Sequence, residues 1–338
     1  MKILLHSDKM DAIEKSGVGR AIKHQMKALE LNNVKYTLDP NDDYDIIHIN
    51  TIFPESYLMG KKAKKKGAKV IYHAHSTEED FRNSFLLSNQ VAPLFKVWLK
   101  KCYSSADLVL TPTPYSKKLL ESYDLGKEII AISNGIELEF FKKNEEEGRA
   151  FRKNFGFSKD DKIIMAVGLY IERKGILDFV EMARRLPEYK FIWFGYTNLN
   201  TIPIKIREAV ETKLDNLYFP GYVPREVLKG AYSGADLFWF PTHEETEGIV
   251  LLEALAVKIP VLIRDIPIYE GWFIDGVNVY KATTNDEFEE KIKGIVEGTL
   301  PSLVEEGYKV AKERDIKNIG KQLKEVYEKV LNEETIKN

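Results

Sequence analysis

Cysteine and long apolar runs are scarce in this 338-residue chain. The single cysteine, Cys102, excludes an internal disulfide, and no cluster of Cys and His residues has the spacing of zinc ligands. No stretch approaches the roughly 18 consecutive apolar residues of a membrane-spanning helix. The apolar run at the start, Met1–His6, is too short for a signal peptide, so we expect a cytoplasmic protein without a transmembrane segment.

An excess of charge of one sign is also missing. The chain has 50 basic and 52 acidic side chains, and the resulting net charge of −2 argues against general nucleic-acid binding. The length exceeds that of one ordinary hydrophobic core and suits two domains of about 150 residues each.

Apolar runs alternate with amphipathic segments in both halves, which is typical of doubly wound α/β domains. We expect strands at 3–6, 46–50, 70–75, 108–111 and 129–133, and then at 163–168, 191–195, 217–220, 237–240, 261–264 and 279–281. These runs predict a first domain over 1–140, a linker over 141–161, a second domain over 162–315 and a last helix within 316–338. A ligand should bind between the halves, at the carboxyl ends of strands from both.

Two carboxylates, Glu245 and Glu253, lie eight positions apart across a loop and the start of an expected helix. A strand, a polar loop and a helix N-terminus form an anion-binding crevice at the carboxyl edge of a parallel sheet. Two acids beside a phosphate would be unfavourable, so we expect them to accept hydrogen bonds from hydroxyls, one from a sugar and one from a ribose. This predicts a nucleotide-sugar site, whereas the alternative is a chance pair of glutamates on a helix face.

Two further loops carry residues suited to a phosphate group. Gly17 opens a helix within Ser16-Gly17-Val18-Gly19-Arg20, where the backbone can approach a ligand and exposed N–H groups favour an anion. In the second half, Lys174 can meet a diphosphate as a point charge and Arg173 can clamp two of its oxygens. Ordinary turn chemistry and a surface Arg-Lys pair are the alternatives.

These motifs resemble those of the retaining glycosyltransferases of family GT4, which have the two-domain GT-B fold. The spacing from Glu245 to Glu253 matches the family's donor-site signature, and Lys174-Gly175 matches its lysine-glycine pair. Ser16-Gly17 stands in the place of the family's Gly-Gly loop. The resemblance implies an α/β architecture with two Rossmann-like domains that face each other across a cleft and a last helix that returns to the first domain.

The resemblance also implies a reaction and the residues that perform it. A sugar would move from a nucleoside diphosphate with retention at the anomeric carbon, and we expect neither a metal nor a cofactor. Lys174 and Arg173 would stabilise the leaving diphosphate, Glu245 would orient the sugar and Glu253 would hold the ribose hydroxyls. The other donor-binding positions implied are Gly17, Gly168, Gly195, Tyr222, Val223, Gly248, Ile249 and Val250.

A histidine is expected near the reacting sugar. The family carries one at the end of the fourth strand of the first domain, where this chain has His75, and His73 is the alternative. A buried histidine whose hydrogen bonds are satisfied is the ordinary interpretation of either residue.

Besides Ser16, other positions depart from the family pattern. Leu169 replaces the usual arginine, so we expect Arg173 to supply the second positive charge. Thr246 and Glu247 stand where relatives usually have glycine and an aromatic residue. We expect this more acidic loop to select the sugar.

The acceptor is suggested by an apolar segment over 81–103 and by six lysines within 61–69. Aromatic and apolar residues beside lysines suit a helix that lies on an anionic membrane, and a core helix beside a solvated lysine face is the alternative. The segments 73–85, 111–116 and 244–248 look like those of bacterial enzymes that add a second hexose to monoglucosyl diacylglycerol.

The resemblance therefore implies a UDP-glucose or UDP-galactose donor, a glycolipid acceptor and a peripheral position on the inner face of the cell membrane. Three alternatives remain open from the sequence. They are a glycosyltransferase with a soluble or polyprenyl-linked acceptor, an inactive nucleotide-sugar-binding protein and a nucleotide-sugar epimerase.

Overall fold

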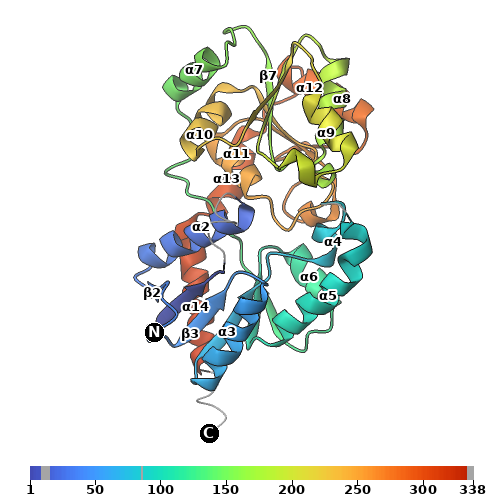
Figure 1. Ribbon diagram of the computed structural model, residues 1–338. Coiled ribbons are helices and arrows are strands. Elements are labelled where there is room, and N and C mark those ends of the chain that lie inside the picture. Colours follow the sequence, from blue (N-terminus) through green and yellow to red (C-terminus); the bar gives the residue numbers. More distant parts are fainter. Residues whose placement is uncertain (9–15, 85–86, 333–338) are drawn as a thin grey trace.

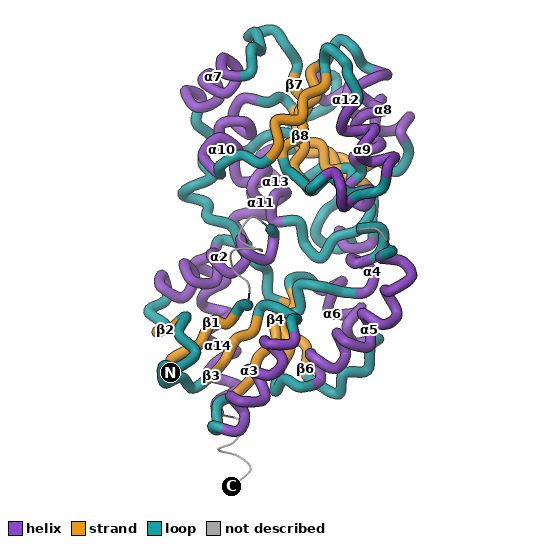
Figure 2. Tube along the Cα trace, in the orientation of Figure 1, coloured by secondary structure: helices purple, strands orange, loops and turns teal. Residues whose placement is uncertain are grey.

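The computed structural model describes residues 1–8, 16–84 and 87–332, and it contains two α/β domains stacked end to end (Figure 1). Each domain holds a six-stranded sheet with helices on its faces (Figure 2). Within the described residues, the strand pairings of both sheets are parallel, as in a doubly wound fold. The predicted fold class is confirmed.

The first sheet has the strand order β2-β1-β3-β4-β5-β6. Its strands are β1 (Lys2–His6), β2 (Lys35–Thr37), β3 (Ile46–Ile49), β4 (Lys69–His73), β5 (Leu108–Thr111) and β6 (Glu128–Ala131). The helices of this domain are α2 (Gly17–Leu31), α3 (Pro54–Lys65), α4 (Glu78–Phe81), α5 (Ser88–Ser104) and α6 (Pro114–Glu121). The edge strand β2 was not predicted, because it has only three residues and none of them is buried.

The second sheet has the order β12-β11-β10-β7-β8-β9. Its strands are β7 (Ile163–Val167), β8 (Lys190–Phe194), β9 (Leu217–Gly221), β10 (Leu237–Phe240), β11 (Val261–Arg264) and β12 (Tyr280–Ala282). The other elements are α7 (Glu145–Asn154), α8 (Ile176–Arg185), α9 (Ile204–Glu211), α10 (Arg225–Gly234), α11 (Ile249–Val257), α12 (Asn285–Val296), α13 (Val304–Glu313), and the short 3-10 turns η1 (Glu172–Lys174), η2 (Leu199–Thr201) and η3 (Pro267–Tyr269).

The strand orders fix where a ligand can bind. Each sheet reverses its winding beside its first strand, at β1 and β3 in the first domain and at β7 and β10 in the second. Loops that leave these strands diverge to opposite faces, and the crevice between them is the usual ligand site of an open α/β sheet. The predicted site loops after β7 and β10 therefore begin at the switch point of the second sheet.

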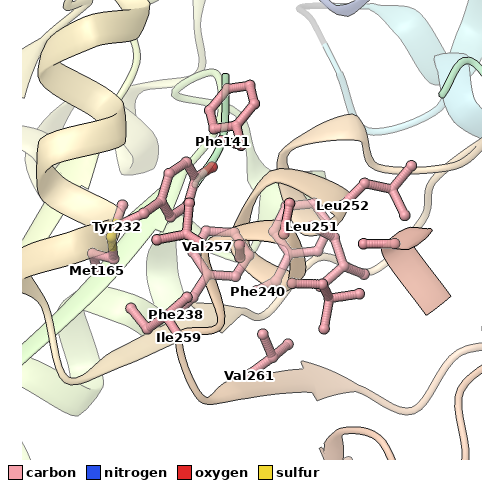
Figure 3. Close-up of a cluster of buried hydrophobic side chains, with 14 of the residues drawn as sticks. Phe141, Met165, Tyr232, Phe238, Phe240, Leu251, Leu252, Val257, Ile259 and Val261 are labelled. Carbon is pink, nitrogen blue, oxygen red and sulfur yellow. The ribbon is translucent and has the colours of Figure 1, made fainter. Parts of the chain in front are cut away.

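The core of the second domain supports one of these loops. Phe238 and Phe240 of β10 pack against Leu251 and Leu252 of α11 (Figure 3), and all four side chains are buried. Because both faces of a parallel sheet are covered, its strands are nearly continuous apolar runs. This packing holds the start of α11 against the end of β10.

The last helix, α14 (Ile316–Asn332), lies beside α2 in the first domain, as predicted (Figure 1). Its Ile319, Leu323 and Tyr327 belong to the same buried cluster as Ile3 and Ile71 of the first sheet. The chain thus crosses twice between the domains. The two crossings are joined where the Ile136 N–H donates to the Arg314 carbonyl at 2.9 Å and the Ile316 N–H donates to the Ile136 carbonyl at 3.1 Å.

The segment expected to be a linker contains α7, and this helix packs on α10 of the second domain. Phe151 is buried there, and Arg152 forms a 2.8 Å ion pair with Asp236. Among the described residues no helix is both long and apolar enough to span a membrane.

Candidate functional site

The Lys174 ammonium pairs directly with the Glu245 carboxylate, which brings together two residues of the predicted site. Gly175 makes this approach possible: its φ is +79°, and a Cβ atom there would lie 2.4 Å from the Pro241 carbonyl oxygen. Burial lowers the pKa of Lys174, although Glu245 opposes the shift. The ring of Phe240 lies 5.5 Å from the ammonium and contributes a cation–π contact.

Gly168 and Gly195 lie at the ends of neighbouring strands and pack against each other. A Cβ atom on Gly195 would stand 1.9 Å from the Gly168 carbonyl oxygen, so no side chain fits at this point. The same oxygen accepts a 2.8 Å hydrogen bond from the Trp193 indole. These glycines shape the crevice floor, and their contact with a donor stays a prediction.

Glu253 lies in the second turn of α11 and is fully buried. One of its oxygens lies 3.0 Å from the Tyr232 hydroxyl, and the other pairs with Arg20 of the first domain. Burial raises the pKa of Glu253, while Arg20 and Tyr232 oppose the rise. The carboxylate is thus held at the domain interface by one partner from each domain.

Ser16 explains one departure from the family pattern. It is the N-cap of α2, and its hydroxyl accepts a 3.3 Å hydrogen bond from the Gly19 N–H. The side chain therefore turns into the helix, which gains a satisfied first turn. Gly17 follows as the first helical residue, and the space beside its Cα is open.

Arg173, the second residue expected to bind the diphosphate, has partners in both domains. Its guanidinium spans the domains to Asp80 of α4 at 2.7 Å and lies 3.2 Å from the Ser84 hydroxyl. It also donates to the Glu244 carbonyl at 2.7 Å. These partners make Arg173 a tie between the domains.

Asp80, Glu244 and Glu245 form an acidic cluster beside Arg173 and Lys174. Burial raises the pKa of Asp80, with Arg173 opposing and Glu245 adding to the rise. Burial likewise raises the pKa of Glu244 to about 7, and the negative charge of Asp80 adds to it. Glu244 is therefore the member of the cluster that titrates near neutrality.

A pH dependence of stability follows from Glu244. Its folded-state pKa of about 7 lies above the ordinary value of 4.5, so the native state binds more protons in this window. We expect this contribution to be complete below pH 4.5 and to be lost as the pH rises through 7. Melting temperatures measured between pH 5 and 8 should fall by roughly 2–4 °C more in the wild type than in Glu244→Gln. Glu226→Gln replaces an exposed residue of α10 and should leave the change of melting temperature with pH as in the wild type. If Glu244→Gln showed the same change of melting temperature with pH as the wild type, the assignment would be contradicted.

Glu247 contacts the first domain, whereas the selection of the sugar by its loop stays a prediction. Its side chain is buried between the domains, where one oxygen accepts hydrogen bonds from the Asn134 N–H at 3.0 Å and from the Asn134 side-chain amide at 2.8 Å. The other oxygen accepts from the Ser133 hydroxyl. Next to it, the Thr113 hydroxyl donates to the Thr246 carbonyl at 3.0 Å. Glu247, which departs from the family pattern, thus connects the second domain to Ser133 and Asn134 of the first domain.

Three histidine rings form a stacked column under the cleft. His75 stacks on His73 at 4.2 Å between ring centroids, and His73 stacks on His48 at 5.3 Å. His73 is the last residue of β4, whereas His75 lies beyond the strand end and is partly exposed. Burial lowers the pKa of His75 and of His48 to about 3, so these rings are neutral at physiological pH. The structure thus favours His75 as the histidine that reaches the cleft.

Hydrogen bonds around the column define the tautomer of His75. Gln25 and Asn50 exchange two amide hydrogen bonds of 2.8 and 2.9 Å, so the Asn50 Oδ1 atom is an acceptor. His75 Nε2 lies 2.9 Å from that oxygen and must carry the proton. The Nδ1 atom of neutral His75 is then left as a hydrogen-bond acceptor.

The remaining predicted donor residues differ in exposure. Tyr222 is exposed after β9, Val223 is partly buried against the core and Ile249 is buried at the start of α11. Gly248 precedes α11 with a φ of +89°, and the Val250 carbonyl lies 3.1 Å from the Tyr232 hydroxyl. Phe85, part of the motif over 73–85, lies outside the described residues.

The roles of Arg20, Asp80 and Glu244 were not predicted. Arg20 is the last residue of the motif Ser16-Gly17-Val18-Gly19-Arg20, which was the available signal. Asp80 pairs with Arg173 of the opposite domain, and Glu244 interacts with Tyr115 and Asp80 of the first domain, which no local pattern predicts. Among the described residues no three His, Cys, Asp or Glu side chains converge as a metal site would require.

Two facing Rossmann-like domains, with a charged site at the carboxyl edges of their sheets, define the GT-B class of glycosyltransferases. Solved structures agree on this fold. Sucrose-phosphate synthase from Thermosynechococcus elongatus has a TM-score of 0.79 at 17% identity over 98% of this chain and 99% of its own. Anabaena HepE in complex with UDP-glucose has a TM-score of 0.72 at 18% identity over 97% of this chain and 100% of its own.

The chain belongs to glycosyltransferase family 4. The model of Glycosyltransferase Family 4 matches residues 22–140, and that of Glycosyl transferases group 1 matches 147–312. A processive diacylglycerol alpha-glucosyltransferase of Acholeplasma laidlawii is 44% identical over 98% of this chain and 99% of its own. An alpha-galactosylglucosyldiacylglycerol synthase of Streptococcus pneumoniae is 26% identical over 86% of this chain and 79% of its own.

Proposed function

We propose that this glycosyltransferase moves a hexose from UDP-glucose or UDP-galactose to a membrane glycolipid, monoglucosyl diacylglycerol, and forms diglycosyl diacylglycerol. The observation that carries the proposal is the Lys174–Glu245 pair at the switch point of the second sheet, in a chain whose relatives are named as diacylglycerol glycosyltransferases. A sugar that binds there would meet a carboxylate for its hydroxyls and an ammonium for its diphosphate.

In the proposed reaction the configuration at the anomeric carbon is retained. UDP-glucose is an α-glycoside, and an α-linked product, as in the names of both relatives, preserves that configuration. The β-phosphate of the donor takes the proton of the attacking hydroxyl, and departure and attack occur on the same face. The protein contributes position and charge through Lys174, Glu245 and Glu253. The Nδ1 atom of His75 accepts a hydrogen bond from a substrate hydroxyl in the cleft.

A second acceptor is favoured by one comparison. The relative with 44% identity is named for glucosyl transfer to diacylglycerol and is called processive. Diacylglycerol itself is therefore a candidate first acceptor, and the monoglucosyl product would be the substrate of the second transfer at the same site.

The direct test is a donor and acceptor screen in mixed micelles. UDP-glucose and UDP-galactose are each incubated with diacylglycerol or monoglucosyl diacylglycerol, and the lipid products are analysed by mass spectrometry and by NMR of the anomeric proton. We expect an α-linked diglycosyl lipid from the monoglucosyl acceptor. Transfer only to soluble or polyprenyl-linked acceptors, or interconversion of sugars without an acceptor, would refute the proposal.

The membrane face of the proposed enzyme is the α3–α5 patch, which we define as Leu58, Val91, Leu94, Val97, Lys61 and Lys101. Leu94 is 73% exposed and Val97 is 65% exposed, although both are apolar. The patch is continuous, because Tyr57 of α3 contacts Trp98 of α5, and Lys61 and Lys101 both lie over the Tyr57 ring. Exposed apolar side chains next to lysines fit an anionic lipid surface.

The patch predicts lipid binding that two substitutions remove. We expect the protein to sediment with vesicles that contain phosphatidylglycerol and to remain unbound with phosphatidylcholine alone. The double variant Leu94→Gln/Val97→Gln should lower the bound fraction about 10-fold or more, since each buried apolar side chain contributes about 1.5–3 kcal/mol. Ile274→Gln, an exposed apolar residue of the second domain, is the matched control. Equal sedimentation of the double variant and the control would exclude the α3–α5 patch as the membrane face.

A further inference from the structure

Arg20 is a charged residue of the first domain that pairs with Glu253 in the proposed donor site. It lies in the first turn of α2, three residues after Gly17, and its N–H donates to the Ser16 carbonyl at 3.1 Å. Its side chain crosses to Glu253 of α11, 233 positions later in the chain. The Arg20 guanidinium therefore links the start of α2 to Glu253, the carboxylate assigned to the ribose.

The pair is unequal in exposure. Glu253 is 0% exposed, whereas the Arg20 side chain is 28% exposed. Burial is the largest single influence on the pKa of Arg20 and lowers it, but the charge and hydrogen bond of Glu253 together with Tyr232 and Tyr222 raise the pKa above its ordinary value. Arg20 thus lies near Glu253, the residue assigned to the ribose, and near Tyr222, which belongs to the loop expected at the nucleobase.

Two other arginines near this edge of the second sheet, Arg173 and Arg264, have several partners each. Arg173 is held by Asp80, Ser84 and the Glu244 carbonyl, as described above. Arg264 donates to Asp178 at 2.8 Å, to the Thr283 carbonyl at 2.6 Å and to the Pro241 carbonyl at 3.0 Å. Neither guanidinium can turn to a phosphate without leaving several acceptors unpaired, and an unpaired buried acceptor is unfavourable.

We propose that Arg20, and not Arg173, supplies the second positive charge for the donor diphosphate, and that its ion pair with Glu253 is the resting arrangement that the nucleotide replaces. The inference rests on the proposed use of a UDP-sugar. When the nucleotide binds, the ribose hydroxyls donate to Glu253 and the guanidinium takes phosphate oxygens. Arginine suits this exchange, because its planar fork binds a phosphate through two parallel hydrogen bonds.

The exchange also ties donor binding to the arrangement of the two domains. Before binding, Arg20 joins the domains through Glu253; afterwards it joins the first domain to the nucleotide, which the second domain holds. The first domain therefore stays engaged throughout, and the departing UDP restores the ion pair.

The test compares the affinities of uridine and UDP by calorimetry, without an acceptor. We expect Arg20→Gln to weaken UDP binding about 10- to 100-fold, the usual loss for a charge-assisted bidentate contact, and to leave uridine binding unchanged or tighter because Glu253 is released. Arg173→Gln should change UDP affinity less than about 3-fold. Arg185→Gln, an exposed arginine of α8, is the matched control.

Two outcomes would overturn the inference. Equal UDP affinity of Arg20→Gln and the wild type would exclude a diphosphate contact, and an equal loss for uridine and UDP would show that Arg20 only positions Glu253. If Arg20→Gln fails to fold, Arg20→Lys takes its place. Lysine keeps the positive charge but lacks the planar guanidinium, so this variant should bind UDP with an affinity between those expected for Arg20→Gln and the wild type. The failure of the Arg20 role can be distinguished from the failure of the proposed function. A wild-type protein that binds no UDP would refute both. Unchanged UDP binding in Arg20→Gln would refute only the role of Arg20, because sugar transfer by the wild type would be unaffected.

Discussion

Replacement of Lys174 by alanine is expected to lower turnover about 100-fold or more, the scale of losing one preorganised charge beside a leaving group. Lys174 is held by Glu245 and by the chain reversal at Gly175, so its ammonium is fixed before the substrate arrives. Without it, the departing diphosphate would lose its nearest positive charge in the second domain, and Glu245 would lose its ion-pair partner. The measurement is the steady-state rate of UDP release with UDP-glucose and a glycolipid acceptor.

Two companion variants separate charge from structure. Lys174→Arg keeps the positive charge and should recover part of the lost turnover. Lys205→Ala removes an exposed lysine that pairs with Glu172 in the same domain, and it should behave as the wild type. Unchanged turnover in a folded Lys174→Ala protein would remove Lys174 from the mechanism.

Replacement of Glu247 by alanine is expected to destabilise the protein by about 3 kcal/mol. The carboxylate accepts hydrogen bonds from the Ser133 hydroxyl and from two N–H groups of Asn134, and all of these donors would lose their acceptor. A buried donor without an acceptor costs about 1–3 kcal/mol. Burial raises the pKa of Glu247, so its charged form is unfavourable in the native protein, and removal of this buried charge offsets part of the loss. The midpoint of urea unfolding, followed by circular dichroism, measures the change.

A double-mutant cycle identifies the contact responsible. Asn134→Ala combined with Glu247→Ala should cost less than the sum of the two single changes, by about 1–3 kcal/mol, because both remove the hydrogen bond from the Asn134 side-chain amide to Glu247. Glu270→Ala, an exposed glutamate after η3, is the control and should leave the midpoint unchanged. Additive effects of the two interface substitutions would contradict the proposed coupling.

The fold could be predicted from the sequence because its signals are local. Strands such as β3 and β10 are short runs in which every residue is buried, and the helices between them begin at capping residues such as Ser16 and Thr113. Strand ends were less certain. The strand expected to reach His75 ends at His73, since the two following residues leave the sheet.

The site could be predicted only in part. Lys174, Glu245 and Glu253 were expected near one another because each follows a strand of the same sheet edge, and the structure brings Lys174 and Glu245 together. The partners of Glu247 could not be predicted, because the composition of a loop does not reveal which partner a carboxylate will meet. Its partners, Ser133 and Asn134, lie more than 100 positions earlier in the chain.

By itself, the sequence determined the two doubly wound domains and the residue types at the crevice, because hydrophobic periodicity and turn residues act over short distances. The return of the last helix was expected only from the resemblance to the family. Only the tertiary structure decided which charges face each other across the crevice. Arg173 turns to Asp80, Arg20 turns to Glu253, and three histidine rings stack beneath them. These pairings depend on how the two sheets face each other. They form because an ion that is buried without a partner costs several kcal/mol.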